Sequence, residues 1–228
     1  DMLNILLKIL THLIKILKTL ETSVVNELKN SDVITTVKKQ SQNKKLKVLL
    51  KNTRNTIGLA YKEISQTQIQ ILKEVAELSE LQTATALNLS LKVDLVVPAI
   101  SQTQLNVIAS STLIEGAPTK QWWSRKGSQF QAKFEDTIRM GMIRGETTDV
   151  IVKTLLGTKA NQFKDGAFIA QKRGAEAIVR SSIQTVANTA RLETYQNNRD
   201  IIDGIQWLST FDNRTSPTCQ VLDGMQWD

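Results

Sequence analysis

The sequence has few of the residues on which most enzymes and disulfide-stabilised proteins depend. It contains one cysteine, Cys219, and one histidine, His12, among 228 residues. One cysteine cannot form an internal disulfide, so we expect assembly in a reducing cytoplasm. Ser–His–Asp and Cys–His enzymes need a histidine beside the nucleophile, and these two residues are far apart in the chain. The sequence therefore does not support a hydrolase of either type, and it predicts no metal site.

Glycine-rich phosphate loops and long apolar runs are missing as well. No stretch fits Gly-x-x-x-x-Gly-Lys-Ser/Thr, which argues against a P-loop nucleotide-binding enzyme. No apolar run reaches the ~18 residues that a membrane span needs. The start of the chain also lacks the basic residues and the small-residue cleavage site of a secretory signal. We therefore expect a protein that is not an enzyme and that uses no cofactor.

The scarcity of aromatic residues and proline favours a helical fold. Aromatic residues make up 5% of the chain, prolines number three, and hydrophobic residues reach 41%. This composition is typical of a globular, mainly α-helical protein. We expect an elongated helical N-terminal region followed by a helical domain with a small β-hairpin or turn unit at its C-terminus. The predicted parts are a basic amphipathic helical arm (1–54), a helical region (55–116) and a C-terminal domain (117–228).

The positive charge is concentrated in the first quarter of the chain. Residues 1–54 hold 11 Lys and Arg against 4 Asp and Glu, whereas residues 55–228 hold 18 of each. A cluster without any acidic residue comprises Lys38, Lys39, Lys44, Lys45, Lys47, Lys51 and Arg54. Such a cluster can neutralise phosphates and bind DNA without reading its sequence. It contains no aromatic residue for base stacking, and the alternative interpretation is an ordinary solvated helix face.

The first twenty residues predict an amphipathic helix. Over residues 2–20, the polar positions Asn4, Lys8, Thr11, Lys15 and Lys18 recur every three or four residues among Leu and Ile. This spacing places them on one narrow stripe opposite a broad apolar face. Three interpretations follow, namely that the apolar face lies in a membrane interface, packs into a groove on a partner protein, or is buried within its own fold or oligomer.

Helical patterns continue through the rest of the chain. We expect an amphipathic helix over 57–92, a link over 93–100, a further helix over 100–113 and a linker at 115–118. A Trp-led helix then follows from Trp122 and ends near Gly141 or Gly145. Thr147 or Thr148 should cap the helix 150–156, which Gly157 should end. The last long helix, over 167–197, is rich in Ala and suits close packing.

The end of the chain combines strand residues with a dense turn. Ile205, Trp207 and Phe211 are typical of a strand, and the run 212–217 (Asp-Asn-Arg-Thr-Ser-Pro) ends it. A turn of this composition usually holds itself with hydrogen bonds from side chains to backbone. A second short strand near Trp227 is expected to pair back. Carboxylates in this stretch are expected to brace an arginine and the backbone rather than to act as general acid and base.

This stretch resembles the C-terminal signature of the phage Mu F-like head morphogenesis family. The pattern is a Trp strand, Asp-x-Arg-Thr-x-Pro-x-Cys, and Leu-Asp-Gly. The matching residues are Trp207, Asp212, Arg214, Thr215, Pro217, Cys219, Leu222, Asp223 and Gly224. The order of segments upstream is also similar, through Gly141 to Thr147 and Ala175 to Arg191, so the resemblance covers about 120–224.

The resemblance implies a function in the head of a tailed bacteriophage. Members of the family are minor head proteins associated with the portal vertex, in head assembly and in DNA packaging or ejection. The implied partners are the portal protein or the major capsid protein and packaged double-stranded DNA, with oligomers in the virion and a passage through the host cytoplasm. The alternative function is a membrane-active or peripheral membrane protein that uses helix 2–20.

The chain departs from the family pattern in one respect. Family members often carry a His-Pro-x-Cys-x-Cys stretch after Leu-Asp-Gly, and this sequence contains none. That stretch could complete a metal or thiol cluster, because zinc needs four such ligands. Cys219 alone does not make a site, and no metal is expected.

Overall fold

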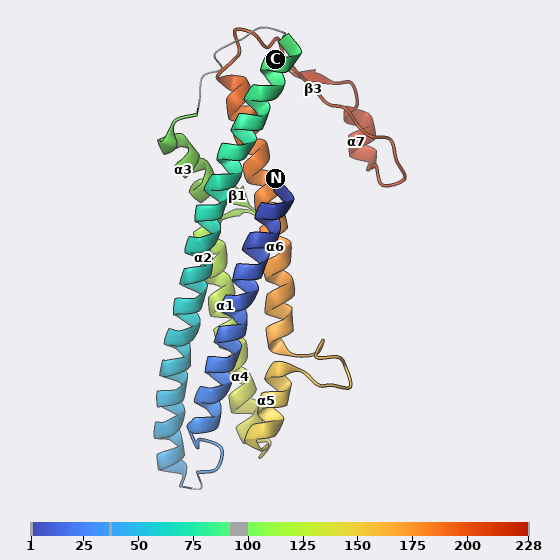
Figure 1. The fold of residues 1–228 in the computed structure, drawn as a ribbon. Coiled ribbons are helices and arrows are strands. Elements are labelled where there is room, and N and C mark those ends of the chain that lie inside the picture. The colour runs from blue at the N-terminus through green and yellow to red at the C-terminus, as the bar shows by residue number, and fades with distance from the viewer. Residues whose placement is uncertain (1, 37, 92–99, 228) are drawn as a thin grey trace.

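The computed structural model describes residues 2–36, 38–91 and 100–227 as an elongated helical bundle with a small unit appended at its C-terminus (Figure 1). The protein is 75% helical, which confirms the prediction of a mainly α fold with a small C-terminal β unit. The elements are α1 (Met2–Asn30), α2 (Lys39–Leu91), α3 (Gln102–Ser111), β1 (Leu113–Ile114), β2 (Ala117–Pro118), α4 (Thr119–Ile143), α5 (Thr148–Leu156), α6 (Ala167–Gln196), β3 (Ile205–Gln206), α7 (Pro217–Leu222) and β4 (Gln226–Trp227).

Helix α2 is the spine of the bundle. Its 53 residues make it about 80 Å long at 1.5 Å per residue. It packs against α1, α3, α4 and α6. Of the long helices, α1 and α4 run antiparallel to α2, whereas α6 runs parallel to it (Figure 1). The helix expected over 57–92 thus begins much earlier, at Lys39. The expected boundary between residues 54 and 55 falls inside this continuous helix.

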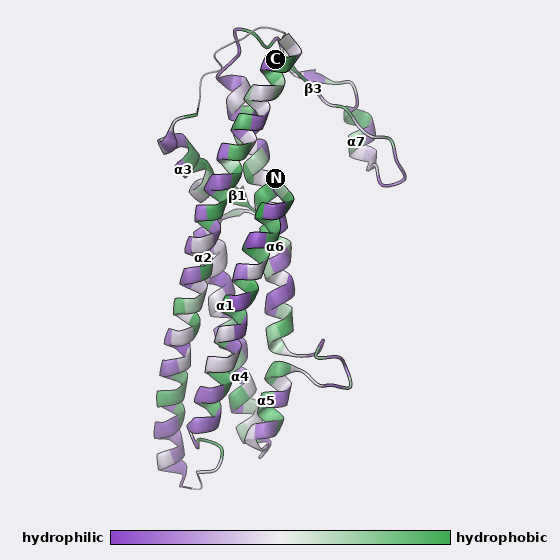
Figure 2. Ribbon diagram, in the orientation of Figure 1, coloured by the Kyte–Doolittle hydropathy of each residue, from purple (hydrophilic) through white to green (hydrophobic). Residues whose placement is uncertain are grey.

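Helix α1 buries one side against its own fold. Its buried residues recur at helical spacing along its whole length, and they are Ile9, Leu13, Ile16, Leu17, Leu20, Val24, Val25 and Leu28. Figure 2 shows apolar and polar residues alternating along this helix, as an amphipathic pattern requires. Lys8 lies 3.0 Å from Glu74 of α2, and Glu21 lies 2.7 Å from Lys172 of α6. The apolar face of α1 is therefore part of the core of the bundle.

The centre of the bundle combines aromatic side chains from α4 with small residues from α6. Trp123, Phe130 and Phe134 of α4 are at most 2% exposed, and Phe130 contacts Phe168 of α6 at a ring-centroid distance of 4.8 Å. On α6 the buried stripe includes Ala175, Ala187 and Ala190, and these small side chains let the helix approach its neighbours closely. The expected Ala-rich packing helix is thus confirmed.

A polar network crosses this apolar core. Trp123 donates its indole N–H to the Oε1 of Gln68, and Gln68 Nε2 donates to Ser182 Oγ over 2.7 Å. Ser182 in turn donates to the carbonyl of Val179 over 2.8 Å. Gln68 and Ser182 are fully buried, so these bonds replace the water that burial removed. The network ties α2, α4 and α6 to one another in a single register.

The linker expected at 115–118 is a tight hairpin instead. Glu115 and Gly116 both have positive φ values, 51° and 80°, as a two-residue turn between antiparallel strands requires. Ile114 and Ala117 beside the turn are buried in the bundle. The expected boundary between residues 116 and 117 therefore coincides with packed structure. The expected link at 93–100 lies outside the described residues, apart from Ile100.

The capping residues predicted for the helix after Gly145 are confirmed. Thr147 accepts a hydrogen bond from the backbone N–H of Val150 and is the N-cap of α5, which Gly157 ends with a φ of 93°. Helix α3 starts after a capping box in which Ser101 and Gln104 satisfy each other's backbone N–H groups.

The loop between α5 and α6 is held by a carboxylate. Asp165 accepts hydrogen bonds from the backbone N–H and hydroxyl of Thr158, both at 2.8 Å, and from the side chain of Asn161 at 2.9 Å. Those bonds, with the Asn161 bond the largest contributor, lower the pKa of Asp165 to about 2.

Candidate nucleic-acid and docking surfaces

The basic cluster forms an exposed face at the start of α2. Lys39, Lys44, Lys47, Lys51 and Arg54, here called the basic face, lie within an arc of about 140° at 3.6 residues per turn. All five side chains are exposed, and Lys38 is exposed just before the helix begins. Buried Leu46 and Leu49 fall outside this arc, and Leu50, also buried, lies at its edge beside Lys39; all three anchor this part of the helix in the core. The hydrophobic pattern of α2 thus points the cations toward solvent.

The remaining cation of the cluster, Lys45, is turned away from the basic face and lies 3.8 Å from Asp32. Arg54 lies 3.0 Å from Glu135 of α4. Partial burial raises the pKa of Glu135, but hydrogen bonds from Gln131 and Arg54 outweigh this and leave it below its usual value. Within the described residues, the other cations form no ion pair, and they are Lys38, Lys39, Lys44, Lys47 and Lys51.

A groove of about 460 Å³ between α2 and α4 adjoins the basic face. Gln131 lines the groove and donates to Glu135, which holds Arg54. Two further cations, Lys62 of α2 and Lys120 of α4, also line it. The cluster predicted from the sequence includes neither residue, since Lys62 lies beyond Arg54, where the cluster ends, and Lys120 belongs to another helix. Helical spacing was the available signal for Lys62, because it lies eleven residues, or about three turns, after Lys51.

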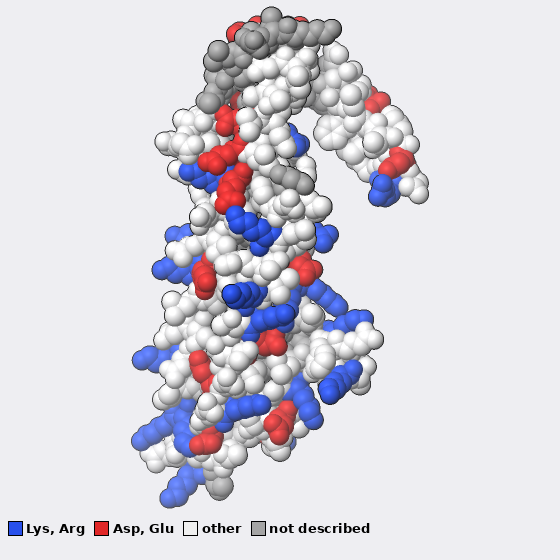
Figure 3. Space-filling model, in the orientation of Figure 1, with Lys and Arg blue, Asp and Glu red and all other residues white. Residues whose placement is uncertain are grey.

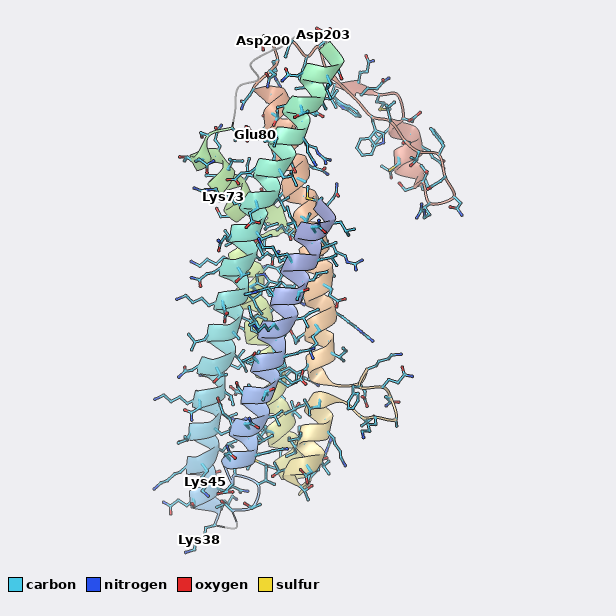
Figure 4. The ribbon with its side chains drawn as sticks, in the orientation of Figure 1. Lys38, Lys45, Lys73, Glu80, Asp200 and Asp203 are labelled. Carbon is cyan, nitrogen blue, oxygen red and sulfur yellow. The ribbon has the colours of Figure 1, made fainter. Side chains whose placement is uncertain are left out.

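The two ends of the bundle carry different charge. Figure 4 shows Lys38 and Lys45 at the end where α2 begins, and Glu80, Asp200 and Asp203 toward the other end. The space-filling view shows Lys and Arg over the lower part of the same face and acidic side chains gathered higher up (Figure 3). A phosphate backbone approaching this molecule is therefore attracted to the end where α2 begins.

The C-terminal turn holds itself, as the sequence predicted. Asp212 Oδ1 accepts the backbone N–H of Arg214 at 2.8 Å, and its Oδ2 lies 3.1 Å from the guanidinium of Arg214. These bonds, with the backbone bond the largest contributor, lower the pKa of Asp212. Thr215 closes the turn by accepting the backbone N–H of Asp212 at 3.0 Å. Pro217 then opens α7, whose N-cap Ser216 accepts the backbone N–H of Cys219.

Ser209 connects the parts of this unit, although the sequence analysis did not single it out. Its hydroxyl donates to the carbonyl of Cys219 at 2.7 Å and accepts from Trp207 Nε1 at 3.1 Å. Its backbone N–H donates to Asp223 Oδ1 at 2.7 Å. Gly224, with a φ of 77°, donates its backbone N–H to the carbonyl of Trp207. The expectation that the carboxylates brace Arg214 and the backbone is confirmed.

Strands β3 and β4 form an antiparallel ribbon with one apolar face. Ile205 pairs with Trp227, and the backbone N–H of Trp207 donates to the carbonyl of Met225. Because side chains alternate along a strand, Ile205, Trp207, Met225 and Trp227 share one face, here called the ribbon face. Gln206 and Gln226 lie on the other face. The expected pairing of a second strand near Trp227 is thus confirmed.

The C-terminal unit, residues 204–227, has no core of its own. None of its residues is buried, and it exposes large apolar side chains throughout. They are Ile205, Trp207, Leu208, Phe211, Val221, Met225 and Trp227. No hydrogen bond or ion pair between described residues joins the unit to the bundle, from which it projects (Figure 1). An isolated two-stranded ribbon is marginal in water, so the unit is suited to being covered by another surface.

The residues considered for catalysis are not brought together. His12 is exposed on α1, while Cys219, a free thiol, lies in α7 of the C-terminal unit. Across the described residues, no three His, Cys, Asp or Glu side chains gather closely enough to hold a metal ion. In the same part of the chain, no helix has the length and apolar character needed to span a bilayer.

Comparison with known proteins adds no relative, because no protein-family model, curated protein or solved structure matches the chain. The resemblance to the Mu F-like family therefore stays a prediction.

Proposed function

We propose that the protein is a minor head protein of a tailed bacteriophage, acting in head assembly and in DNA packaging or ejection. The observation that carries the proposal is the separation of two surfaces. A solvent-facing basic face lies where α2 begins. An uncovered apolar unit with the family motif projects to the side near the other end of this helix, which is about 80 Å long. A protein that joins DNA to a protein shell needs two such surfaces.

In this proposal the basic face contacts the phosphate backbone of packaged DNA. Lysines without acidic partners gain most from phosphate, because no internal ion pair has to be broken. The face has no aromatic side chain, so its contacts carry no base preference. The domain over 117–228 docks on the portal or capsid through its C-terminal unit, which places the protein inside the head at the portal vertex.

The membrane alternative is weaker in this fold. It depended on the apolar face of α1, and that face is buried between α2 and α6. Inserting α1 into a bilayer would require it to leave the core and expose the surfaces it covers. Absence of binding to anionic liposomes by the full-length protein, together with binding to DNA, is the expected result.

The DNA contact is tested by reversing charges on the basic face. We expect Lys44→Glu, Lys47→Glu and Lys51→Glu, combined, to weaken binding to a labelled duplex and to lower the salt slope of log K by about 2.7, or 0.9 per contact. Fluorescence anisotropy over a series of salt concentrations measures both quantities. The loss should be the same for duplexes of unrelated sequence.

A matched control variant separates the effect of the basic face on DNA binding from the effect of a change in net charge. Lys153, Lys159 and Lys164 are exposed on α5 and the following loop, so their replacement by Glu changes the net charge equally at another site. We expect this variant to keep a salt slope close to that of the wild type. Equal losses in both variants, or unchanged binding in the first, would remove DNA contact from the proposed function.

A further inference from the structure

The ribbon face is an apolar surface without any charge. Its four side chains, Ile205, Trp207, Met225 and Trp227, are between 38% and 45% exposed. Within the C-terminal unit, Asp212 pairs with Arg214 and Asp223 accepts from the backbone of Ser209. Asp203, just before the unit, borders the face, because it lines a small pocket with Ile205 and Trp227. We propose that this face packs against the same face of a second copy of the chain, which makes the protein a two-fold dimer joined through its C-terminal units.

The identity of the occupant follows from what a two-fold interface requires. In such an interface residue i of one copy contacts residue j of the other and j contacts i, so in a patch as small as this one a charge would lie near its own copy. The ribbon face contains none, and its two tryptophans supply flat surfaces that can stack on one another. A two-stranded ribbon also lacks a second layer, and an identical ribbon provides one of the same width.

The size of the face is sufficient for a dimer of moderate affinity. Four side chains of this kind, a little under half exposed, offer on the order of 400 Å² of apolar surface. At an apolar share of roughly 60%, this corresponds to about 650 Å² of interface for each copy. That value is close to the ~800 Å² per partner of a standard interface, so we expect dissociation in the micromolar range.

The C-terminal unit projects from the bundle (Figure 1), and the four side chains of the ribbon face remain 38–45% exposed in the presence of the bundle. The dimer covers the ribbon face alone and leaves Leu208, Phe211 and Val221 of the C-terminal unit exposed for contact with the portal or capsid. It does not depend on the proposed function, since a dimer that binds no DNA would leave this inference standing.

Sedimentation velocity on the full-length chain, from about 1 to 200 µM, tests the inference. We expect a monomer–dimer equilibrium in the wild type. Met225→Glu and Met225→Lys should each weaken dimerisation about tenfold or more, because each brings like charges together. Mixing the two variants should restore the dimer, since Glu then faces Lys. A unit that had merely unfolded would not recover on mixing.

A control variant removes apolar surface from the C-terminal unit outside the ribbon face. Leu208 and Val221 are 78% and 68% exposed, and their combined replacement by Ser should leave dimerisation unchanged. A wild type that remains monomeric at 200 µM overturns the inference. So does a dimer that tolerates both Met225 variants, or one that does not return when the variants are mixed.

Discussion

Single carboxylates hold two of the exposed turns of this protein. Asp212 ties the C-terminal turn through Arg214 and Thr215, and Asp165 does the same for the loop between α5 and α6 through Thr158 and Asn161. In both cases the acceptor oxygens satisfy donors that no regular element provides. The ionised form is the one that accepts these bonds, so the pKa of each carboxyl lies below its ordinary value.

A pH titration checks the role of Asp165. Its folded-state pKa of about 2 lies below the ordinary value of 3.8, so its stabilising effect is fully present above about pH 4 and is lost as the pH falls through 2. We expect the carboxyl ¹³C signal of Asp165 to titrate near pH 2. Asp165→Asn should loosen the loop near neutral pH and remove this titration. A midpoint near 4 would show that the bonds to Thr158 and Asn161 do not persist in solution.

For single residues, the sequence predicted the roles of those whose hydrogen-bond partners lie close to them in the chain. Thr147 as an N-cap, Gly157 as a helix end and the self-bonded turn at Asp212 all depend on neighbours within a few positions. The partners of Gln68 and Ser209 could not be predicted, because each depends on a residue from another element. Amphipathic spacing places Gln68 on a helix, but only the packed bundle brings it to Trp123.

Close approach between helices decides which glycines are required. Gly141 lies in α4 where a Cβ atom would come within 2.5 Å of the Ile151 side chain of α5. Gly174, in α6, has nothing within 4 Å of the same position. Gly174 occupies a helix interior, where alanine is intrinsically favoured over glycine by about 1 kcal/mol, and Gly141 lies in the last turn of α4. The two positions therefore differ mainly in the space that surrounds them.

We expect Gly174→Ala to stabilise the protein by roughly 0.5–1 kcal/mol and Gly141→Ala to destabilise it by about 1–3 kcal/mol, as overpacking does. Urea unfolding followed by circular dichroism measures both free energies. If alanine stabilised both positions equally, α4 and α5 would not approach each other as closely as the structure places them.

The existence of the helices was predicted better than the positions of their ends. The period of apolar residues identified α1, α2, α4 and α6, because burial of one face leaves a regular pattern. The start of α2 was placed too late, since its first turns carry the basic face and few apolar residues. The hairpin at 113–118 was interpreted as a linker, because a Gly–Ala–Pro sequence can occur both in a linker and beside a two-residue hairpin turn.

For the whole molecule, the sequence indicated which segments are basic but not where their charges point. The arm predicted over 1–54 comprises α1, whose apolar face is in the core, and the first part of α2, whose cations face solvent. Lys62 and Lys120 join the same side of the bundle only because α2 and α4 pack together. The C-terminal unit has no buried residue and projects from the bundle. The spacing of residues along the sequence predicted its strands and turn but did not reveal that they form no core.

The most direct test of the account is lysine footprinting of purified phage heads, comparing DNA-filled virions with DNA-free proheads. Acetylation followed by mass spectrometry reports the reactivity of each lysine. We expect Lys44, Lys47 and Lys51 to be protected in filled heads and reactive in empty ones, while Lys153 and Lys159 react equally in both. Equal reactivity of the basic face in the two particles, or absence of the protein from both, would contradict it.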